Sequence, residues 1–391
     1  MIPEVLTVQF IMRVCIRSEG KAEGRDEDLQ EEKYEMAIKP GALGYRQDSA
    51  GYRELQISCS PMSVSGTLAV RGDCMKKLIR PAFSEAAIML SITSMIILYI
   101  TCSVEADEKK NASFLSRKIV ACKDGVTVES CLYMSSRLKV KGLLFTPESE
   151  KQLPCIIFCH DGITGISREH RMSCIRLAKA GYVVFSPSYR GEDGSEGTVE
   201  IAKGEVYDVL NALPILKCLE TVDGDRIAVA GASHGALIAV LAASRSSELK
   251  AVVAAYGVMD IYQWWDYLRK SNKLGNDRIT RLTYGNGPGD QPESFAIRNA
   301  VTQVKGLSCP VLILQGEKDS IVPPLQGKVL EEALRAQHKK CELRLYPNCA
   351  HGFLVYVPWL DDPAIDVKER KETEEAWRHM LWFLDEVLKG R

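Results

Sequence analysis

The sequence predicts an α/β domain in which helices cover both faces of a mostly parallel sheet. Three observations lead to this prediction: short β-rich segments open the domain, strands and helices then alternate, and a long helix with one apolar face ends the chain. Strands that recur between helical segments are typical of parallel sheets covered on both sides. No repeat of about 20–50 residues is visible, so a propeller is not expected.

The elements follow in order within residues 115–391. The opening β-rich segments are 118–122, 127–132 and 138–145. The strands that come after them are 155–159, 182–185, 227–230, 252–255, 311–314 and 342–346. The helices between and after these strands are 199–219, 236–243, 326–336 and 369–388. Pro214 should kink or break the first of these helices.

Composition excludes several classes of protein. The 391 residues are 46% hydrophobic and 26% charged, as in ordinary globular chains, so wholesale disorder, collagen and a disulfide mini-protein are excluded. Fifty Lys and Arg balance 51 Asp and Glu, and the net charge is −1. No basic field exists to hold a phosphate backbone, and nucleic-acid binding is not expected.

The N-terminal region differs from the rest. Residues 1–74 contain no sustained apolar period, and acidic and basic side chains alternate from Glu19 to Glu35, so we expect a poorly structured leader. Residues 86–104 contain no charged side chain and are long enough for a membrane-spanning helix. With the basic residues before them, they indicate a signal peptide or transmembrane anchor over residues 75–106. The alternative is a buried helix.

This segment also predicts a location. Basic residues precede it and acidic residues follow it, so the positive-inside rule places the downstream domain on the extracytoplasmic side, with membrane contact through residues 86–104. Nine cysteines after residue 110, an odd number without a CxxC pair, favour the alternative of a cytoplasmic protein. Cys155 and Cys159 share one face of a predicted strand, as small buried hydrophobes do. We expect neither a metal nor a cofactor.

The strongest motif is Gly231-Ala232-Ser233-His234-Gly235, between a predicted strand and a predicted helix. This is the context of a nucleophile elbow, in which a sharp turn exposes the serine hydroxyl above the sheet. Small residues two positions before and after the serine leave room for that turn. Ser233 is therefore the candidate nucleophile.

A serine hydroxyl needs a base to take its proton. His351 is the best placed of the six histidines, because it follows the strand 342–346 in a loop before the final helix. His160 ends an early strand and is expected to shape the oxyanion loop. His234 adjoins Ser233 and cannot fold back on it. The other three lie in charged segments that we expect to be solvated helices: His170, His338 and His379.

The base in turn needs a carboxylate to orient it. Asp319 follows the strand 311–314, where open α/β sheets collect functional groups. Glu317 and Asp260 are the alternatives. The order Ser233, Asp319, His351 along the chain is that of the α/β-hydrolases.

An oxyanion hole needs two backbone N–H donors. One should be the amide of His234, the residue after the nucleophile. The other should come from the turn at 160–165, with Ile163 as first choice and Gly162 as second. The segment 189–193, which includes Glu192 and Asp193, is expected to structure the rim of the site.

The segment 260–302 is the expected wall of a substrate pocket. Trp264, Trp265 and Tyr267 could line an apolar site, together with Tyr284. The alternative is that these aromatic side chains pack against one another and form the core of this segment between two strands.

Four stretches carry a family resemblance: GASHG after VDGDRIAVA, QGEKDSIVPP, YPNCAHGF and SYRGEDGSEG. Over roughly residues 120–390 the chain resembles the catalytic domain of the prolyl oligopeptidase and dienelactone hydrolase groups of α/β-hydrolases. The resemblance implies that Ser233 is the nucleophile, Asp319 the acid and His351 the base. True dienelactone hydrolases carry cysteine at the nucleophile, so Ser233 favours a peptidase or an esterase.

The expected function is therefore that of a serine hydrolase of the prolyl oligopeptidase type. It would cleave peptide (amide) or ester bonds in small molecules or short peptides through an acyl-enzyme intermediate. A carboxylesterase resembling dienelactone hydrolase is the alternative. A remote alternative is an inactive scaffold that acts as a binding module.

Overall fold

The computed structural model describes residues 112–275 and 278–390, together with four strands nearer the N-terminus. The chain divides into two units, Met1–Cys102 and Ser103–Arg391. The hydrophobic segment 86–104, predicted to be an anchor or signal peptide, lies outside the described residues. In the part of the chain that is described, no helix is both long and apolar enough to cross a membrane.

The first unit contains an antiparallel sheet where the sequence predicted poor structure. Its strands are β1 (Met12–Val14), β2 (Glu32–Lys39), β3 (Ala42–Cys59) and β4 (Val64–Gly66). In β2 the apolar residues Tyr34, Met36 and Ile38 alternate with other residue types, which is a short strand period. This alternation extends over only a few residues, which is too short to predict a sheet from the sequence.

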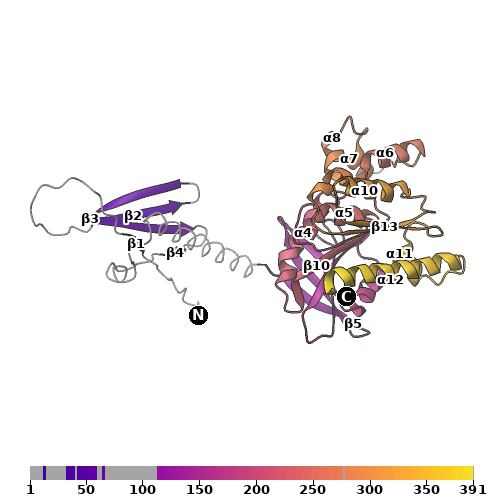
Figure 1. Ribbon diagram of the computed structural model, residues 1–391, viewed down its shortest axis with the longest axis horizontal. Coiled ribbons are helices and arrows are strands. Elements are labelled where there is room, and N and C mark those ends of the chain that lie inside the picture. The colour runs from indigo at the N-terminus through magenta and orange to yellow at the C-terminus, as the bar shows by residue number, and fades with distance from the viewer. Residues whose placement is uncertain are drawn as a thin grey trace, which may run out of the picture. The chain divides into compact units, whose positions relative to one another are not determined.

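The second unit is built on a nine-stranded sheet (Figure 1). The strand order is β13-β12-β11-β10-β8-β9-β7-β6-β5, and the six strands from β9 to β13 at one side run parallel. These are β8 (Leu153–Cys159), β9 (Val183–Pro187), β10 (Val222–Ala232), β11 (Val252–Ala255), β12 (Val311–Gly316) and β13 (Cys341–Tyr346). The predicted mostly parallel sheet is confirmed.

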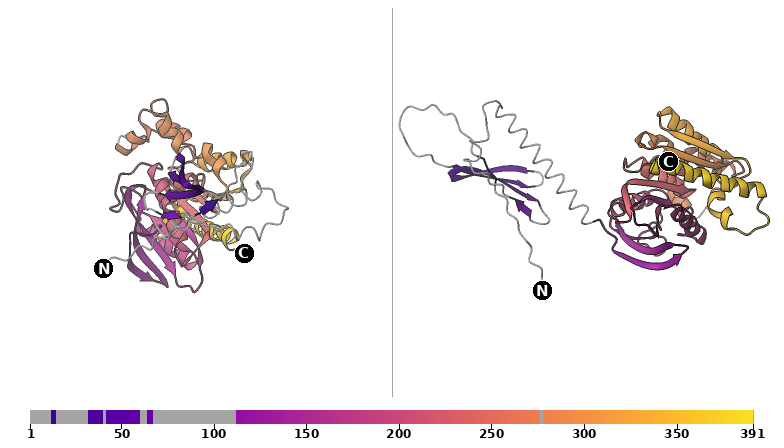
Figure 2. Two further views of the ribbon diagram at one scale, coloured as in Figure 1. Left: turned by 90° about the vertical axis from the view of Figure 1, so that its left-hand side faces the viewer. Right: turned by 60° about the horizontal axis from the view of Figure 1, so that its bottom comes forward.

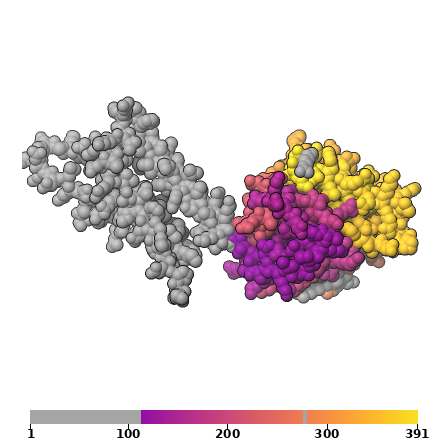
Figure 3. All heavy atoms as spheres, turned by 90° about the horizontal axis from the view of Figure 1, so that it is seen from below, coloured from indigo at the N-terminus to yellow at the C-terminus, as the bar shows by residue number. Residues whose placement is uncertain are grey.

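The remaining strands form an antiparallel edge, namely β5 (Ser116–Lys123), β6 (Val126–Ser135) and β7 (Leu138–Pro147). Every residue of β5 is exposed, as expected of the last strand of a sheet. Figure 3 shows the surface of this part of the unit, in purple, on the same face as the C-terminal residues, in yellow.

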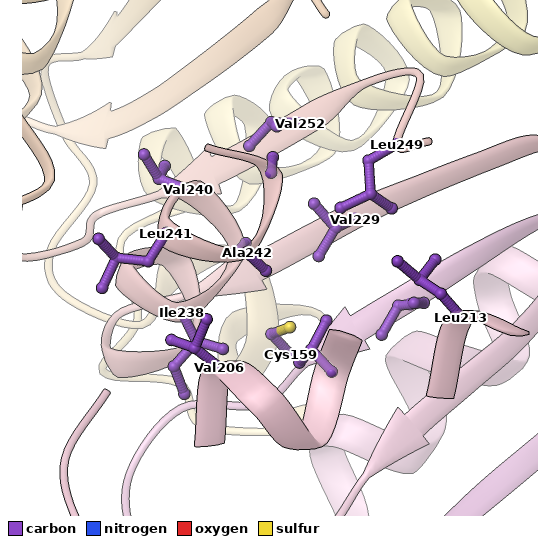
Figure 4. Close-up of a cluster of buried hydrophobic side chains, with 14 of the residues drawn as sticks. Cys159, Val206, Leu213, Val229, Ile238, Val240, Leu241, Ala242, Leu249 and Val252 are labelled. Atoms are coloured by element: carbon purple, nitrogen blue, oxygen red, sulfur yellow. The ribbon is translucent and has the colours of Figure 1, made fainter. Parts of the chain in front are cut away.

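Helices cover both faces of the sheet, as predicted. On one face lie α4 (Gly204–Lys217), α5 (His234–Ala243) and α10 (Leu325–Ala336), and on the other lie α3 (Arg168–Lys179), α11 (Phe353–Tyr356) and α12 (Val367–Lys389). Each face of the sheet packs against its helices in a separate hydrophobic core, and successive residues of β8 point into the two cores alternately. Ile157 lies in the core with α4, α5 and α10, and Ile156 and Phe158 lie in the core with α3, α11 and α12. Figure 4 shows the first core around Cys159, Val206 and Ile238.

Two predictions about α4 need correction. The helix begins at Gly204, not at 199, because the Glu205 carboxylate accepts the backbone amides of Glu200, Ile201 and Lys203 and holds them in a loop. Pro214 does not break the helix. It is exposed and lies in the last turn, where the missing N–H costs a single backbone hydrogen bond.

The buried cysteines behave as small hydrophobic side chains. Cys155 and Cys159 are fully buried in the same core, and no disulfide joins any of the nine cysteines in residues 112–275 and 278–390. Burial raises the pKa of the Cys159 thiol to about 12, which keeps it protonated. Across residues 112–275 and 278–390, no group of three or more His, Cys, Asp or Glu side chains could hold a metal ion.

The segment between β11 and β12 forms a separate helical group. It comprises α6 (Ile261–Lys270), α7 (Arg278–Tyr284), α8 (Pro292–Arg298) and the short α9 (Ala300–Gln303). Figures 1 and 2 show α6, α7 and α8 standing off one end of the sheet. Ile261, Trp265 and Phe295 form a small core of their own there.

The topology fixes where a site can form. From β8 the chain passes to β9 on one side and then to β10 on the other, so the direction of winding reverses at β8. Functional groups collect outside the carboxyl ends of strands at such a point. The register pairs Gly231 of β10 with Cys159 of β8, and Gly316 of β12 with Tyr346 of β13. The loops that carry Ser233, the 160–165 turn, Asp319 and His351 therefore leave the same end of the sheet.

Candidate active site

Ser233 occupies a strained backbone position between β10 and α5. Its φ is 51° and its ψ is −116°, a conformation that L-residues rarely adopt and that costs on the order of 1–3 kcal/mol. The glycines of the motif explain how this turn fits. A Cβ at Gly231 would collide with the carbonyl oxygen of Gly235, and a Cβ at Gly235 would collide with the carbonyl oxygen of Cys159. The strand-to-helix turn predicted from the sequence is therefore present.

Ser233, His351 and Asp319 form one chain of hydrogen bonds. The Oγ of Ser233 lies 3.1 Å from Nε2 of His351, and Nδ1 of His351 lies 2.8 Å from Oδ2 of Asp319. A carboxylate can only accept here, so Nδ1 carries the proton and the lone pair of Nε2 faces the serine. The structure thus brings together the three side chains that the sequence singled out, across 118 positions between serine and histidine.

The loop after β12 fixes the Asp319 carboxylate. Asp319 is 4% exposed, and its Oδ1 accepts the backbone amides of Ile321 at 2.9 Å and Val322 at 2.8 Å. Oδ2 is thereby left to face His351. Glu317 and Asp260 were the alternatives for the acid. Glu317 is exposed, and the Asp260 carboxylate caps the N-terminus of α6.

The turn after β8 carries the two candidates for the second oxyanion donor. His160 is fully buried at its start, and burial lowers the pKa of its imidazole to about 4, so the ring is neutral. Gly162 has a φ of +67° and is exposed, and Ile163 next to it is half-buried. The structure places both candidates, Ile163 and Gly162, in this turn.

A buried network that the sequence analysis missed anchors the same turn. His170 was expected in a solvated helix, but it is 2% exposed and its Nε2 lies 2.9 Å from Oδ1 of Asp161. The Tyr356 hydroxyl donates to the same oxygen at 2.6 Å. His170 is held in place because its Nδ1 accepts the amide of Ser167, the N-cap of α3. The one local signal was the serine three residues before His170, at a helix start.

Glu192 and Asp193 hold the far end of the turn. The Gly165 amide donates to Oε2 of Glu192 at 2.5 Å, and the Ile166 amide donates to Oδ2 of Asp193 at 3.0 Å. A Cβ at Gly165 would collide with the Asp193 carboxylate. The Glu192 and Asp193 carboxylates, in the segment predicted to structure the rim of the site, therefore hold the end of the turn after β8.

Glu192 should make stability depend on pH. The residue is 4% exposed, and burial raises its pKa from 4.5 to about 8. The folded chain then binds more protons than the unfolded chain between these two values, so the free energy of unfolding falls as pH rises through that window. Glu192→Gln keeps an acceptor for Gly165 and cannot ionise. Between pH 5 and pH 9 we therefore expect the free energy of unfolding to fall less in the variant than in the wild type. The difference should be on the order of 2–4 kcal/mol.

Urea unfolding of the wild type and the variant at pH 5 and pH 9 measures the difference. Glu220→Gln is the matched control, because Glu220 is exposed. An identical change in stability between the two pH values for wild type and Glu192→Gln would contradict the assignment.

The aromatic side chains of α6 divide into two groups. Trp265 is 8% exposed and packs against Tyr284 and Phe295, so it belongs to the core of the segment between β11 and β12 and not to a pocket wall. Trp264 and Tyr267 are half-buried and stacked, with ring centroids 5.5 Å apart. The Tyr267 hydroxyl donates to the carbonyl oxygen of Ser320 at 2.5 Å, which places this pair beside the Asp319 loop.

Fold and site together define an α/β-hydrolase. The pattern of the dienelactone hydrolase family matches residues 140–388, and the chain belongs to that family of hydrolases. It is 31% identical over 229 residues to the uncharacterized peptidase YtmA of Bacillus subtilis (strain 168), an alignment that covers 58% of this chain and 87% of YtmA.

Solved structures share the fold. Acylaminoacyl peptidase of Pyrococcus horikoshii superposes with a TM-score of 0.56 at 18% identity, over 69% of this chain and 43% of the peptidase. This chain therefore spans less than half of that protein. Acetyl xylan esterase 1 of Thermoanaerobacterium sp. gives a TM-score of 0.53 at 17% identity, over 72% of this chain and 91% of the esterase.

Proposed function

We propose that the protein is a serine hydrolase that cleaves ester or peptide (amide) bonds through an acyl-enzyme, with Ser233 as nucleophile. The observation that carries the proposal is the hydrogen-bonded chain from Ser233 through His351 to Asp319. The strained turn under Ser233 supports it, because such strain is kept where it serves a function.

Acylation follows from this geometry. His351 takes the proton from the Ser233 hydroxyl through Nε2 as Oγ attacks the substrate carbonyl carbon. Asp319 stabilises the imidazolium and keeps the proton of Nδ1 in place. His351 then gives the abstracted proton to the leaving alcohol or amine, and the acyl group stays on Ser233.

The negative charge that develops on the carbonyl oxygen needs donors. The His234 amide is at the N-terminus of α5, where a backbone N–H has no partner within its helix. Ile163 supplies the second N–H, with Gly162 as the alternative. Water attacks the acyl-enzyme in the second half of the cycle, with His351 again as base.

The surroundings of the site support an apolar acyl or side-chain group on the substrate. Trp264 and Tyr267 are stacked beside the Asp319 loop, and Ile321 and Leu325, which follow Asp319 in the chain, are more than half exposed. Such partly exposed apolar side chains near a nucleophile fit a small-molecule or short-peptide substrate.

A panel of substrates tests the proposal. Nitrophenyl esters of increasing acyl length and a set of aminoacyl nitroanilides would be compared for kcat/KM, with fluorophosphonate labelling and peptide mapping in parallel. We expect turnover of at least one class and a label on Ser233. A folded protein that neither labels at Ser233 nor turns over any member would contradict the proposal and leave a binding scaffold.

A further inference from the structure

The side chain of His234 connects two loops and does not point back to Ser233. Its Nδ1 lies 2.9 Å from the carbonyl oxygen of Gly162, and its Nε2 lies 3.0 Å from the backbone nitrogen of Ala202. A backbone N–H can only donate, so Nε2 accepts. The proton of the neutral ring is therefore on Nδ1, which donates to the Gly162 carbonyl.

This bond fixes the orientation of one peptide group. The Gly162 carbonyl and the Ile163 N–H belong to the same planar trans unit and point in opposite directions. Drawing the carbonyl toward the His234 ring turns the Ile163 N–H away from the ring. Within residues 112–275 and 278–390, the Ile163 N–H donates a hydrogen bond to no acceptor. It is thus a free donor in a turn that leaves the same end of the sheet as the Ser233 turn.

The loop at the other end of the ring is held firmly. Ile201 and Ala202 both have a φ of +52°, and Glu205 accepts the Ile201 amide. Arg298, which is 4% exposed, reaches from α8 to donate to the carbonyl oxygens of Ile201 and Glu200, both at 2.6 Å. The Ala202 amide therefore has a fixed position, and its hydrogen bond to Nε2 fixes that end of the imidazole.

We propose that His234 is a positioning residue for the reaction, whose side chain holds the Gly162–Ile163 peptide so that the Ile163 N–H faces the oxyanion. The inference rests on the proposed function and goes beyond it, since it assigns a role to the side chain of His234 and chooses Ile163 over Gly162. Burial of the ring lowers the pKa of His234, which supports the neutral form that the two bonds require.

Three variants of His234 distinguish the role of the hydrogen bond to Gly162 from that of the hydrogen bond to Ala202. In His234→Asn the amide nitrogen takes the place of Nδ1 and can still donate to Gly162. In His234→Gln the side-chain amide reaches the position of Nε2 and can form only the hydrogen bond with Ala202. His234→Leu can form neither hydrogen bond. We expect kcat on the best ester of the panel to fall about 10²- to 10³-fold in the Gln and Leu variants, the loss typical of one oxyanion donor. KM should change little, and Asn should recover most of kcat.

Thermal unfolding and crystal structures complete the test. A purely structural role would lower Tm and kcat together in all three variants, with no recovery by Asn, and would overturn the inference. So would wild-type kcat in His234→Leu. If the wild type has no turnover at all, the proposed function fails separately. The crystal structure then still decides, because an unchanged Gly162–Ile163 peptide in His234→Leu would overturn the role of the ring.

Discussion

Replacing Ser233 with alanine is expected to lower kcat by roughly 10⁶-fold, the loss seen when the nucleophile of a serine hydrolase is removed. The Oγ of Ser233 is the atom 3.1 Å from Nε2 of His351, and no acyl-enzyme can form without it. Alanine tolerates the positive φ of this turn about as well as serine does, so the fold should persist.

The measurement is ester turnover together with fluorophosphonate labelling at equal protein concentration. Ser247→Ala is the control, because Ser247 is an exposed serine in the same unit. It should retain wild-type activity and label. Labelling of Ser233→Ala at the wild-type rate, with unchanged Tm, would place the nucleophile elsewhere.

Asp319→Asn is expected to reduce kcat about 10⁴-fold while leaving the loop intact. The backbone amides of Ile321 and Val322 require an acceptor at Oδ1, so the asparagine oxygen should take that position. Its NH₂ group then faces Nδ1 of His351 and can only donate. Nδ1 becomes the acceptor, the proton moves to Nε2, and the lone pair that should take the serine proton is lost.

Glu317→Gln is the matched control for this variant. Glu317 is an exposed carboxylate two positions earlier in the same loop, and we expect its removal to change kcat less than about twofold. Comparable losses in Glu317→Gln and Asp319→Asn would show that the loop and not the Asp319 carboxylate matters. Full activity of Asp319→Asn would remove Asp319 from the mechanism.

The two sets of side-chain contacts that hold the 160–165 turn were predictable to different degrees. Glu192 and Asp193 follow a recognisable strand end, so their place at the rim could be inferred from the chain alone. The bond of His170 to Asp161 could not, because the charged residues around His170 resemble those of a solvated helix. The ring of Tyr356 packs against that histidine and its hydroxyl donates to Asp161, which lies 195 positions away in the chain.

The same contrast explains the aromatic residues of α6. Trp264, Trp265 and Tyr267 are equally apolar, and nothing local separates a pocket wall from a packing residue. Trp265 is buried because Phe295 of α8 packs against it, whereas Tyr267 reaches out to Ser320. Which face of a short helix meets solvent depends on the neighbour that covers the opposite face.

By itself, the sequence determined the strand and helix periods, the glycines that permit the turn under Ser233, and the order of nucleophile, acid and base. These properties are local, because backbone sterics and apolar spacing act over a few residues. Only the tertiary structure decided that Asp319 and not Asp260 meets His351, and that the ring of His234 reaches Gly162. Hydrogen-bond partners and burial are set by segments that the sheet register brings together, and that register is a property of the whole fold.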